Sequence, residues 1–155
     1  MADALVAAIR MRPLPPPLAA LYLTDPIAEL GAIDGIMLSG AERDVIALAE
    51  KAHVPIAMTL LGLGGVPAHH PLNLGMMGMH GEAWVNRAVQ EADLLIALGM
   101  RFDDRVTGNL KTYAPHAKKI HVDIDPAEFN KNVKVDAAIS GNVKDIVALW
   151  LPHLA

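Results

Sequence analysis

Cysteine is absent from this chain of 155 residues. Its absence excludes disulfide bonds, a thiolate nucleophile and a zinc site with cysteine ligands, and nothing marks a secreted protein. No apolar run reaches the roughly 18 residues that a membrane-spanning helix needs, so no membrane association is expected. A reducing compartment is therefore expected by elimination. The bacterial cytoplasm is the first expectation, and a plastid or a mitochondrion stays open.

The chain also lacks a cluster of basic residues. It carries 13 lysines and arginines against 17 aspartates and glutamates, a net charge of −4, and a nucleic-acid partner is not expected. The opening "MADALVAAIRMR" has too short an apolar part, and is too acidic at Asp3, for a signal or transit peptide.

The motifs of several catalytic classes are missing as well. We find no P-loop, no Ser-His-Asp ordering and no carboxylate pair that indicates acid-base catalysis, so no catalytic residue is predicted. His69 and His70 are adjacent rather than spaced along a helix face, and we expect a surface loop there and no metal site.

What is present is a globular composition, with 53% hydrophobic and 19% charged residues. We expect one compact domain at 35–155, with the segment 1–34 packed on it. Prolines between residues 13 and 17 would break a helix, and "LAALYL" at 18–23 is consistent with an entering strand.

From Gly35 onward, apolar patterns alternate in type. Ser39 followed by Glu42 is a capping-box signature at the start of a helix reaching residue 52. A second helix is expected at 82–92 and a third at 143–151. The second helix has the apolar stripe Trp84, Val85, Ala88, Val89 and Ala92. A buried strand is expected at 54–60, further strands at 93–99 and 118–125, and a short strand at 137–142, with glycine-rich loops at 62–65 and 75–81.

The predicted strands alternate with helices and are apolar on both faces. This pattern is typical of a parallel sheet covered by helices on each side. The right-handed crossover rule then favours an α/β fold of three layers, a doubly wound parallel sheet of Rossmann-like type.

A charged loop follows the apolar strand at 93–99, where ligands bind in such sheets. Arg101 and Arg105 could hold phosphate or carboxylate oxygens as planar forks. Asp103 could hold an arginine in place or accept from ribose hydroxyls, as could Asp104, and Phe102 offers an apolar face to a ring. The alternative is a solvated turn with local ion pairs.

Three other segments end at the same expected edge. They are "TLLGLG" after the strand at 54–60, "GMMGMHG" before a helix N-terminus that favours an anion, and "DIDPAE" after the strand at 118–125. Each is a weak signal alone, because such a loop is usually only a turn. Together the four loops predict a long groove that fits a dinucleotide.

The motifs "GMMGMHG" (75–81), "GMRFDDRVTG" (99–108) and "HVDIDPAE" (121–128) occur here in an order that resembles one family. From about Ser39 to Leu151 the chain resembles the central domain of acetohydroxyacid synthase, also called acetolactate synthase. That resemblance implies a three-domain enzyme in which the flanking domains bind thiamine diphosphate and magnesium. It also implies a homo-oligomer, and a reaction of pyruvate with a 2-keto acid in branched-chain amino acid biosynthesis.

The resemblance implies that this domain binds FAD, which has no net redox part in the reaction, and that the domain alone is inactive. The FAD contacts that it implies are Gly35, Thr59, Leu60, Leu61, Met77, Gly78, Met79, His80, Gly99, Met100, Arg101, Asp103, Arg105, Val106, Asp123, Ile124, Glu128, Gly141, Asn142 and Val143.

Two features depart from the family pattern. Ile33 and Asp34 precede Gly35 where the family has small residues, and Asn142 stands where it usually has aspartate. A second hypothesis is therefore a non-catalytic scaffold or assembly domain of the same fold that has lost FAD. A third, a free-standing nucleotide-binding enzyme such as a NAD-dependent deacylase relative, is disfavoured because no zinc ribbon or catalytic histidine motif is evident.

Overall fold

A computed structural model describes residues 19–23 and 36–154, and its centre is a sheet of six parallel strands in the order β3-β2-β1-β4-β5-β6. The strands are β1 (Ala19–Leu23), β2 (Ile56–Met58), β3 (Asn73–Met76), β4 (Leu94–Leu98), β5 (Lys118–Asp123) and β6 (Ala137–Ser140). The strand expected at 18–23 is confirmed, and it lies in the middle of the sheet between β2 and β4.

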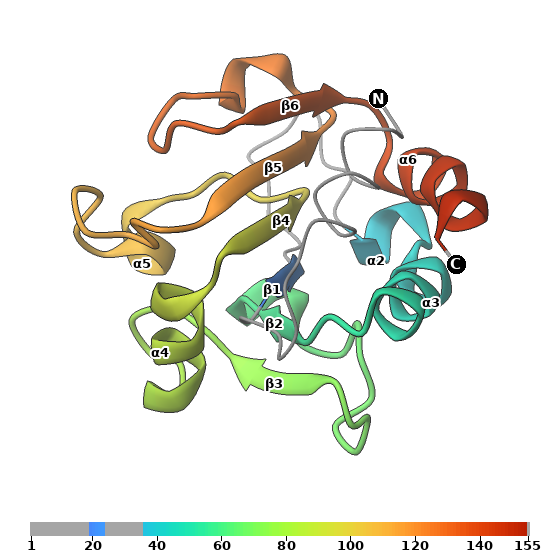
Figure 1. Cartoon of the computed structure of the whole chain (residues 1–155), viewed down its shortest axis with the longest axis horizontal. Helices are drawn as coiled ribbons and strands as arrows, with labels where there is room; N and C mark the ends of the chain where they lie inside the picture. Colours follow the sequence, from blue (N-terminus) through green and yellow to red (C-terminus); the bar gives the residue numbers. More distant parts are fainter. Residues whose placement is uncertain (1–18, 24–35, 155) are drawn as a thin grey trace.

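Helices cover both faces of the sheet (Figure 1). On one face lie α2 (Ile36–Ser39), α3 (Glu42–Ala52) and α6 (Val143–Trp150); on the other lie α4 (Ala83–Glu91) and α5 (Asp104–Thr107). Short 3-10 turns occur at Leu60–Gly62, Pro126–Glu128 and Leu151–His153. The predicted doubly wound α/β sandwich of three layers is confirmed.

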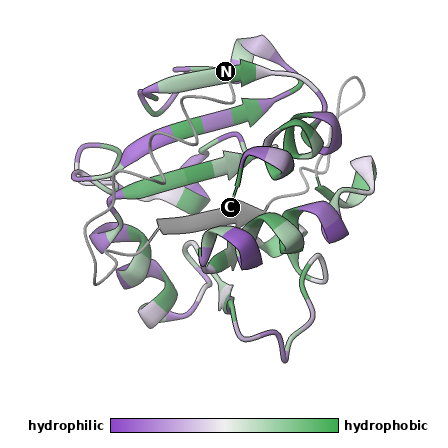
Figure 2. Cartoon of the chain, turned by 45° about the vertical axis from the view of Figure 1, so that its right-hand side comes forward, coloured by the Kyte–Doolittle hydropathy of each residue, from purple (hydrophilic) through white to green (hydrophobic). Residues whose placement is uncertain are grey.

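Each face of the sheet has its own apolar core. The first packs β-strand side chains such as Ile56 and Ile96 against Val45, Leu48 and Trp150 of the helices. The second gathers Leu95 and Ala97 with side chains from α4, the turn after β4 and the loop before β5. β4 is buried at all five positions because both of its faces are covered, and in Figure 2 it is the uniformly hydrophobic strand beside the grey β1.

The capping box predicted at Ser39 and Glu42 is wrong. The Ser39 hydroxyl donates to the carbonyl of Ile36 at 3.0 Å and so completes α2 instead. Gly40, with φ +66°, then ends that turn. The residue before α3 is Ala41, and it makes no side-chain hydrogen bond to the helix.

The apolar stripe predicted for the second helix is wrong at Trp84, which is 66% exposed. Val85, Val89 and Ala92 face the sheet as expected. Trp84 lies beside the buried stripe formed by Val85, Val89 and Ala92. Its Nε1 donates to the carbonyl of Leu74 at 3.3 Å. The indole therefore covers the backbone of edge strand β3.

Three short elements were not predicted: helix α2, strand β3 and helix α5. Strand β3 overlaps the expected loop at 75–81, because its glycine and its four half-buried positions hide the usual strand pattern. Helix α5 lies inside the expected charged loop. The sequence positions 1–18 and 24–35, including the proline cluster and Ile33–Gly35, fall outside the described residues.

Candidate functional site

The carboxyl ends of the strands form one rim of the sheet, because all six strands run parallel. Five spacings between neighbouring strands make this rim about 24 Å long. The strand order reverses between β1 and β4, and in open α/β sheets ligands bind at such a switch point. The turn that begins at Gly99 follows β4 directly, so it lies at this position.

The glycine loop after β3 and the charged turn after β4 are joined on this rim. The N–H of Met79 donates to the carbonyl of Arg105 at 2.7 Å. Asn86 of α4 fixes the neighbouring Gly78: its Oδ1 accepts from the Gly78 N–H at 2.8 Å and its Nδ2 donates to the Gly78 carbonyl at 2.9 Å. The expected convergence of these two loops is confirmed.

Within the charged turn, buried and exposed side chains alternate. Met100 and Phe102 are 1% and 2% exposed, whereas Arg101 between them is exposed. Gly99, with φ +65°, donates its N–H to the carbonyl of Val122 at 2.8 Å and ties the turn to β5. The turn therefore projects the Arg101 guanidinium from a fixed backbone.

Two interpretations of this turn are wrong. Phe102 offers no face to a ligand, because its ring is buried against Tyr113 and His121. The interpretation that Asp103 holds an arginine in place is also wrong, because its Oδ1 caps α5 by accepting from the N–H of Val106 at 3.2 Å; the alternative, acceptance from a ribose hydroxyl, stays a prediction. Among the described residues, neither arginine of the turn forms an ion pair with Asp103 or Asp104.

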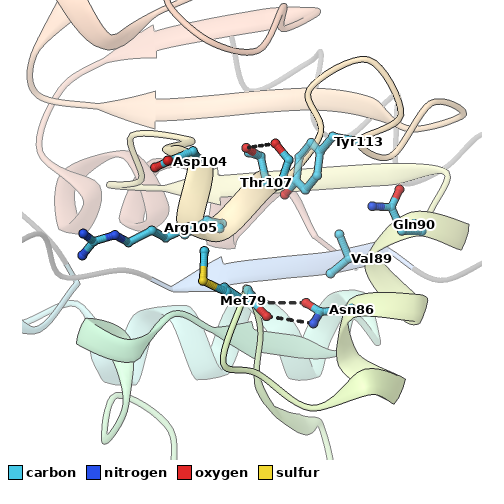
Figure 3. Close-up of a pocket in the computed structure, with 11 residues that line it drawn as sticks. Met79, Asn86, Val89, Gln90, Asp104, Arg105, Thr107 and Tyr113 are labelled. Atoms are coloured by element: carbon cyan, nitrogen blue, oxygen red, sulfur yellow. Dashed lines mark hydrogen bonds between the residues drawn. The ribbon is translucent and has the colours of Figure 1, made fainter.

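A cavity of about 260 Å³ lies between α4 and α5. Figure 3 shows Val89 and Tyr113 facing one another across it, and the Arg105 guanidinium pointing away from it. The side-chain Oε1 of Gln90 on this side accepts from the N–H of Ala114 at 2.8 Å. The cavity is thus on the face of the sheet that α4 and α5 cover, beside the joined loops.

The end of β5 carries a buried acidic position. One oxygen of Asp123, Oδ1, accepts from the Asp125 N–H at 2.9 Å, and the residue is 6% exposed. Its Oδ2 lies 3.7 Å from Nε2 of His121, which is fully buried as a core histidine. Glu128 pairs with Lys131 at 2.8 Å. The Asp123 carboxylate therefore stabilises the turn after β5 through its hydrogen bond to the Asp125 N–H.

At the end of β6, Asn142 caps α6. Its Oδ1 accepts from the N–H of Lys144 at 2.9 Å, and the N–H of Gly141 donates to the carbonyl of Asp123 at 3.0 Å. An amide oxygen caps as well as a carboxylate oxygen, so asparagine in place of the family's usual aspartate preserves this helix start.

The predicted contact residues divide by exposure. Those exposed on the rim are Leu60, Met79, His80, Arg101 and Arg105. Half-buried are Leu61, Asp103, Val106, Ile124, Glu128, Gly141 and Asn142. Buried are Thr59, Met77, Gly78, Gly99, Met100, Asp123 and Val143. The buried group can meet a ligand chiefly through backbone atoms, and Gly35 lies outside the described residues.

Two displaced pKa values occur at the opposite end of β5. Burial lowers the pKa of Lys119, whose Nζ donates to the carbonyls of Ala114 and Ala117. Burial alone would raise the pKa of Asp136, but the Lys119 N–H and the Lys118 ammonium outweigh it and lower that pKa. These groups hold the sheet together away from the rim.

Sequence reasoning missed Asn86 and Asn132, which fix the rim loops through backbone groups. Asn132 donates from Nδ2 to the carbonyl of Phe102 at 3.2 Å across 30 residues of sequence. Neither residue lies in a distinctive motif, so only the three-dimensional contacts identify them. Within 19–23 and 36–154, no group of three or more metal-ligating side chains is found, and no helix is long and apolar enough to cross a bilayer.

Residues 32–149 match the family model described as the central domain of thiamine pyrophosphate enzymes. The chain belongs to this family. It is 51% identical over 113 residues to a probable acetolactate synthase large subunit of Methanocaldococcus jannaschii, covering 73% of this chain and 19% of that protein. The acetolactate synthase isozyme 1 large subunit of Escherichia coli is 52% identical over 112 residues, covering 72% of this chain and 20% of that protein.

An acetolactate synthase of Mycobacterium avium is 50% identical over 114 residues, 74% of this chain and 18% of that protein. The resemblance inferred from the rim motifs is thereby confirmed. The chain spans about a fifth of the length of these curated relatives.

Proposed function

We propose that this domain binds FAD along the rim as the central domain of an acetolactate synthase large subunit. The observation that carries the proposal is the joining of the glycine loop to the charged turn at the sheet's switch point, with Arg101 exposed between two buried residues. In that enzyme the flanking domains hold thiamine diphosphate and magnesium, and pyruvate condenses with a second 2-keto acid for branched-chain amino acid synthesis.

The side chains on the rim suit the parts of FAD. Arg101 is a fixed-backbone cation, which suits the pyrophosphate oxygens. Leu60 and Met79 are 65% and 67% exposed and offer apolar contact to a flat ring system. Backbone groups of Gly99 and Gly141 allow close approach to the sugar and phosphate chain. In this role FAD supplies structure to the enzyme rather than net electron transfer.

The proposal includes the surroundings of the domain. The whole enzyme would be a homo-oligomer in the bacterial cytoplasm, and this chain alone would not form acetolactate. Purified chain incubated with pyruvate, thiamine diphosphate and magnesium is expected to show no turnover. Turnover would contradict the assignment of the active site to flanking domains.

FAD binding is tested by titrating the chain with FAD and following flavin fluorescence. We expect saturable quenching, and a dissociation constant at least about tenfold higher in Arg101→Ala, because a charge-assisted contact is lost. Arg43→Ala is the matched control, since it removes the same charge from an exposed position on α3. Equal weakening in both variants would indicate a nonspecific charge effect and contradict the assignment of Arg101.

A scaffold that has lost FAD is the second candidate, favoured by Ile33 and Asp34 where the family has small residues. Absence of quenching at high micromolar FAD would favour it. Replacing both residues by glycine is expected to tighten FAD binding if this loop weakens phosphate contact. An unchanged dissociation constant would show that the loop is not the cause.

A further inference from the structure

We infer that Asn132 is a positioning residue for Arg101 and acts through the carbonyl of Phe102. This inference rests on the proposed FAD site. Asn132 lies in the segment between the 3-10 turn Pro126–Glu128 and β6. Its Nδ2 donates to the Phe102 carbonyl at 3.2 Å, so it holds the backbone one residue after Arg101.

The turn after β4 needs a stabilising contact of this kind because its backbone is strained at Phe102. Phe102 has φ +51°, a left-handed conformation that is unfavourable for a residue with a large side chain. A relaxed turn would move Phe102 toward negative φ and redirect the residues on both sides. The surrounding structure must therefore supply contacts that exist only in the strained form.

Two sets of contacts do this. The Phe102 ring packs edge-on against Tyr113, with centroids 6.1 Å apart, and against His121, with centroids 5.1 Å apart. His121 is packed in turn against Phe129 at 5.2 Å. The ring contacts fix the side chain, and the Asn132 amide fixes the carbonyl, so the peptide group after Phe102 has one orientation.

The fixed orientation of the Phe102 peptide affects rim residues on both sides of it in the sequence. Toward the N-terminus, Arg101 lies between the buried Met100 and Phe102 and is directed outward. Toward the C-terminus, Asp103 caps α5, and the Arg105 carbonyl in that helix accepts from Met79. The orientation of the Phe102 peptide thus sets the position of the cation and of the link to the glycine loop.

A double-mutant cycle tests the inference. Asn132→Ala is expected to weaken FAD binding about 3-fold to 10-fold, the effect of one hydrogen bond. In the Arg101→Ala background the same change is expected to have a clearly smaller effect, because the cation that it positions is gone and only the link to the glycine loop is still affected. Equal losses in both backgrounds would overturn the inference, as would no loss in the wild-type background.

Asn130→Ala is the matched control. Asn130 lies two residues away, and its Oδ1 accepts from the Val135 N–H at 3.0 Å, so it braces the same segment through a different hydrogen bond. We expect little change in FAD affinity from this variant. A loss equal to that of Asn132→Ala would mean that the whole segment, and not the Asn132 amide, affects binding.

A measurement without FAD separates this inference from the proposed function. Amide hydrogen exchange in the apo chain is expected to accelerate at Met79 and Val106 in Asn132→Ala but not in Asn130→Ala, since both amides depend on the turn. If the wild type fails to bind FAD but exchange follows this pattern, the cofactor assignment fails and the positioning of the turn stands. Unchanged exchange overturns the positioning itself.

Discussion

The carbonyl of Arg105 accepts a hydrogen bond from the N–H of Met79 at 2.7 Å, and the same oxygen lies 2.8 Å from where a Cβ on Gly78 would be. The loop after β3 and the helix after β4 can approach this closely only because residue 78 has no side chain. The arrangement of the rim thus depends on one glycine.

Gly78→Ala is expected to destabilise the chain by about 2–4 kcal/mol, because the methyl group meets backbone and φ is +95°. Gly64→Ala is the control: its φ of +99° is close to that of Gly78, but nothing lies within 4 Å of an added Cβ. That variant should lose only about 1–2 kcal/mol from its backbone conformation. Urea unfolding measures both, and equal losses would show that contact with Arg105 is unimportant.

Trp84 and Val85 test which face of α4 is buried. Val85→Ala should cost about 2 kcal/mol of unfolding free energy, because the side chain is fully buried. Trp84→Ala should cost less than about 1 kcal/mol, since the ring is mostly exposed and gives up one hydrogen bond. A larger loss at Trp84 than at Val85, measured by the same method, would contradict the observed packing of α4.

Asp136 should make stability depend on pH at the acidic end. Its pKa in the folded chain lies below 3.8, so its contribution is present above that value and is lost as pH falls through the lower folded pKa. Asp136→Asn should therefore be about 0.5–1 kcal/mol less stable at neutral pH, with the difference shrinking in acid. Urea unfolding of both proteins across this range checks it, and a difference independent of pH would exclude the carboxylate as its source.

The layer order and the rim were predictable from the sequence because they depend on patterns of several residues. Apolar strands such as β4 are buried on both faces, and that alone indicates a covered parallel sheet. Glycines and charges at strand ends then locate the rim. Strand β3 was not predicted, because Gly75, with φ +102°, interrupts its sequence pattern and its pairing with β2 is irregular.

The roles of single side chains were less predictable, because they depend on contacts between distant residues. Phe102 looks like a ligand-facing ring in sequence, yet His121 and Tyr113 enclose it. Asp103 looks like a partner for an arginine, yet the start of α5 uses it as a cap. Local sequence gives a residue's chemistry, whereas the neighbours that use that chemistry come from the fold.

The central place of β1 has a consequence for how the chain assembles. Its partners β2 and β4 begin at Ile56 and Leu94, so β1 must wait for segments that are synthesised later before it can pair. Deleting β1 would remove a central strand rather than an edge strand. The sheet would be divided into two strands, β3 and β2, and three strands, β4 to β6, each with unpaired backbone groups on the side that β1 had occupied. Truncations used to isolate this domain must therefore retain residues 19–23.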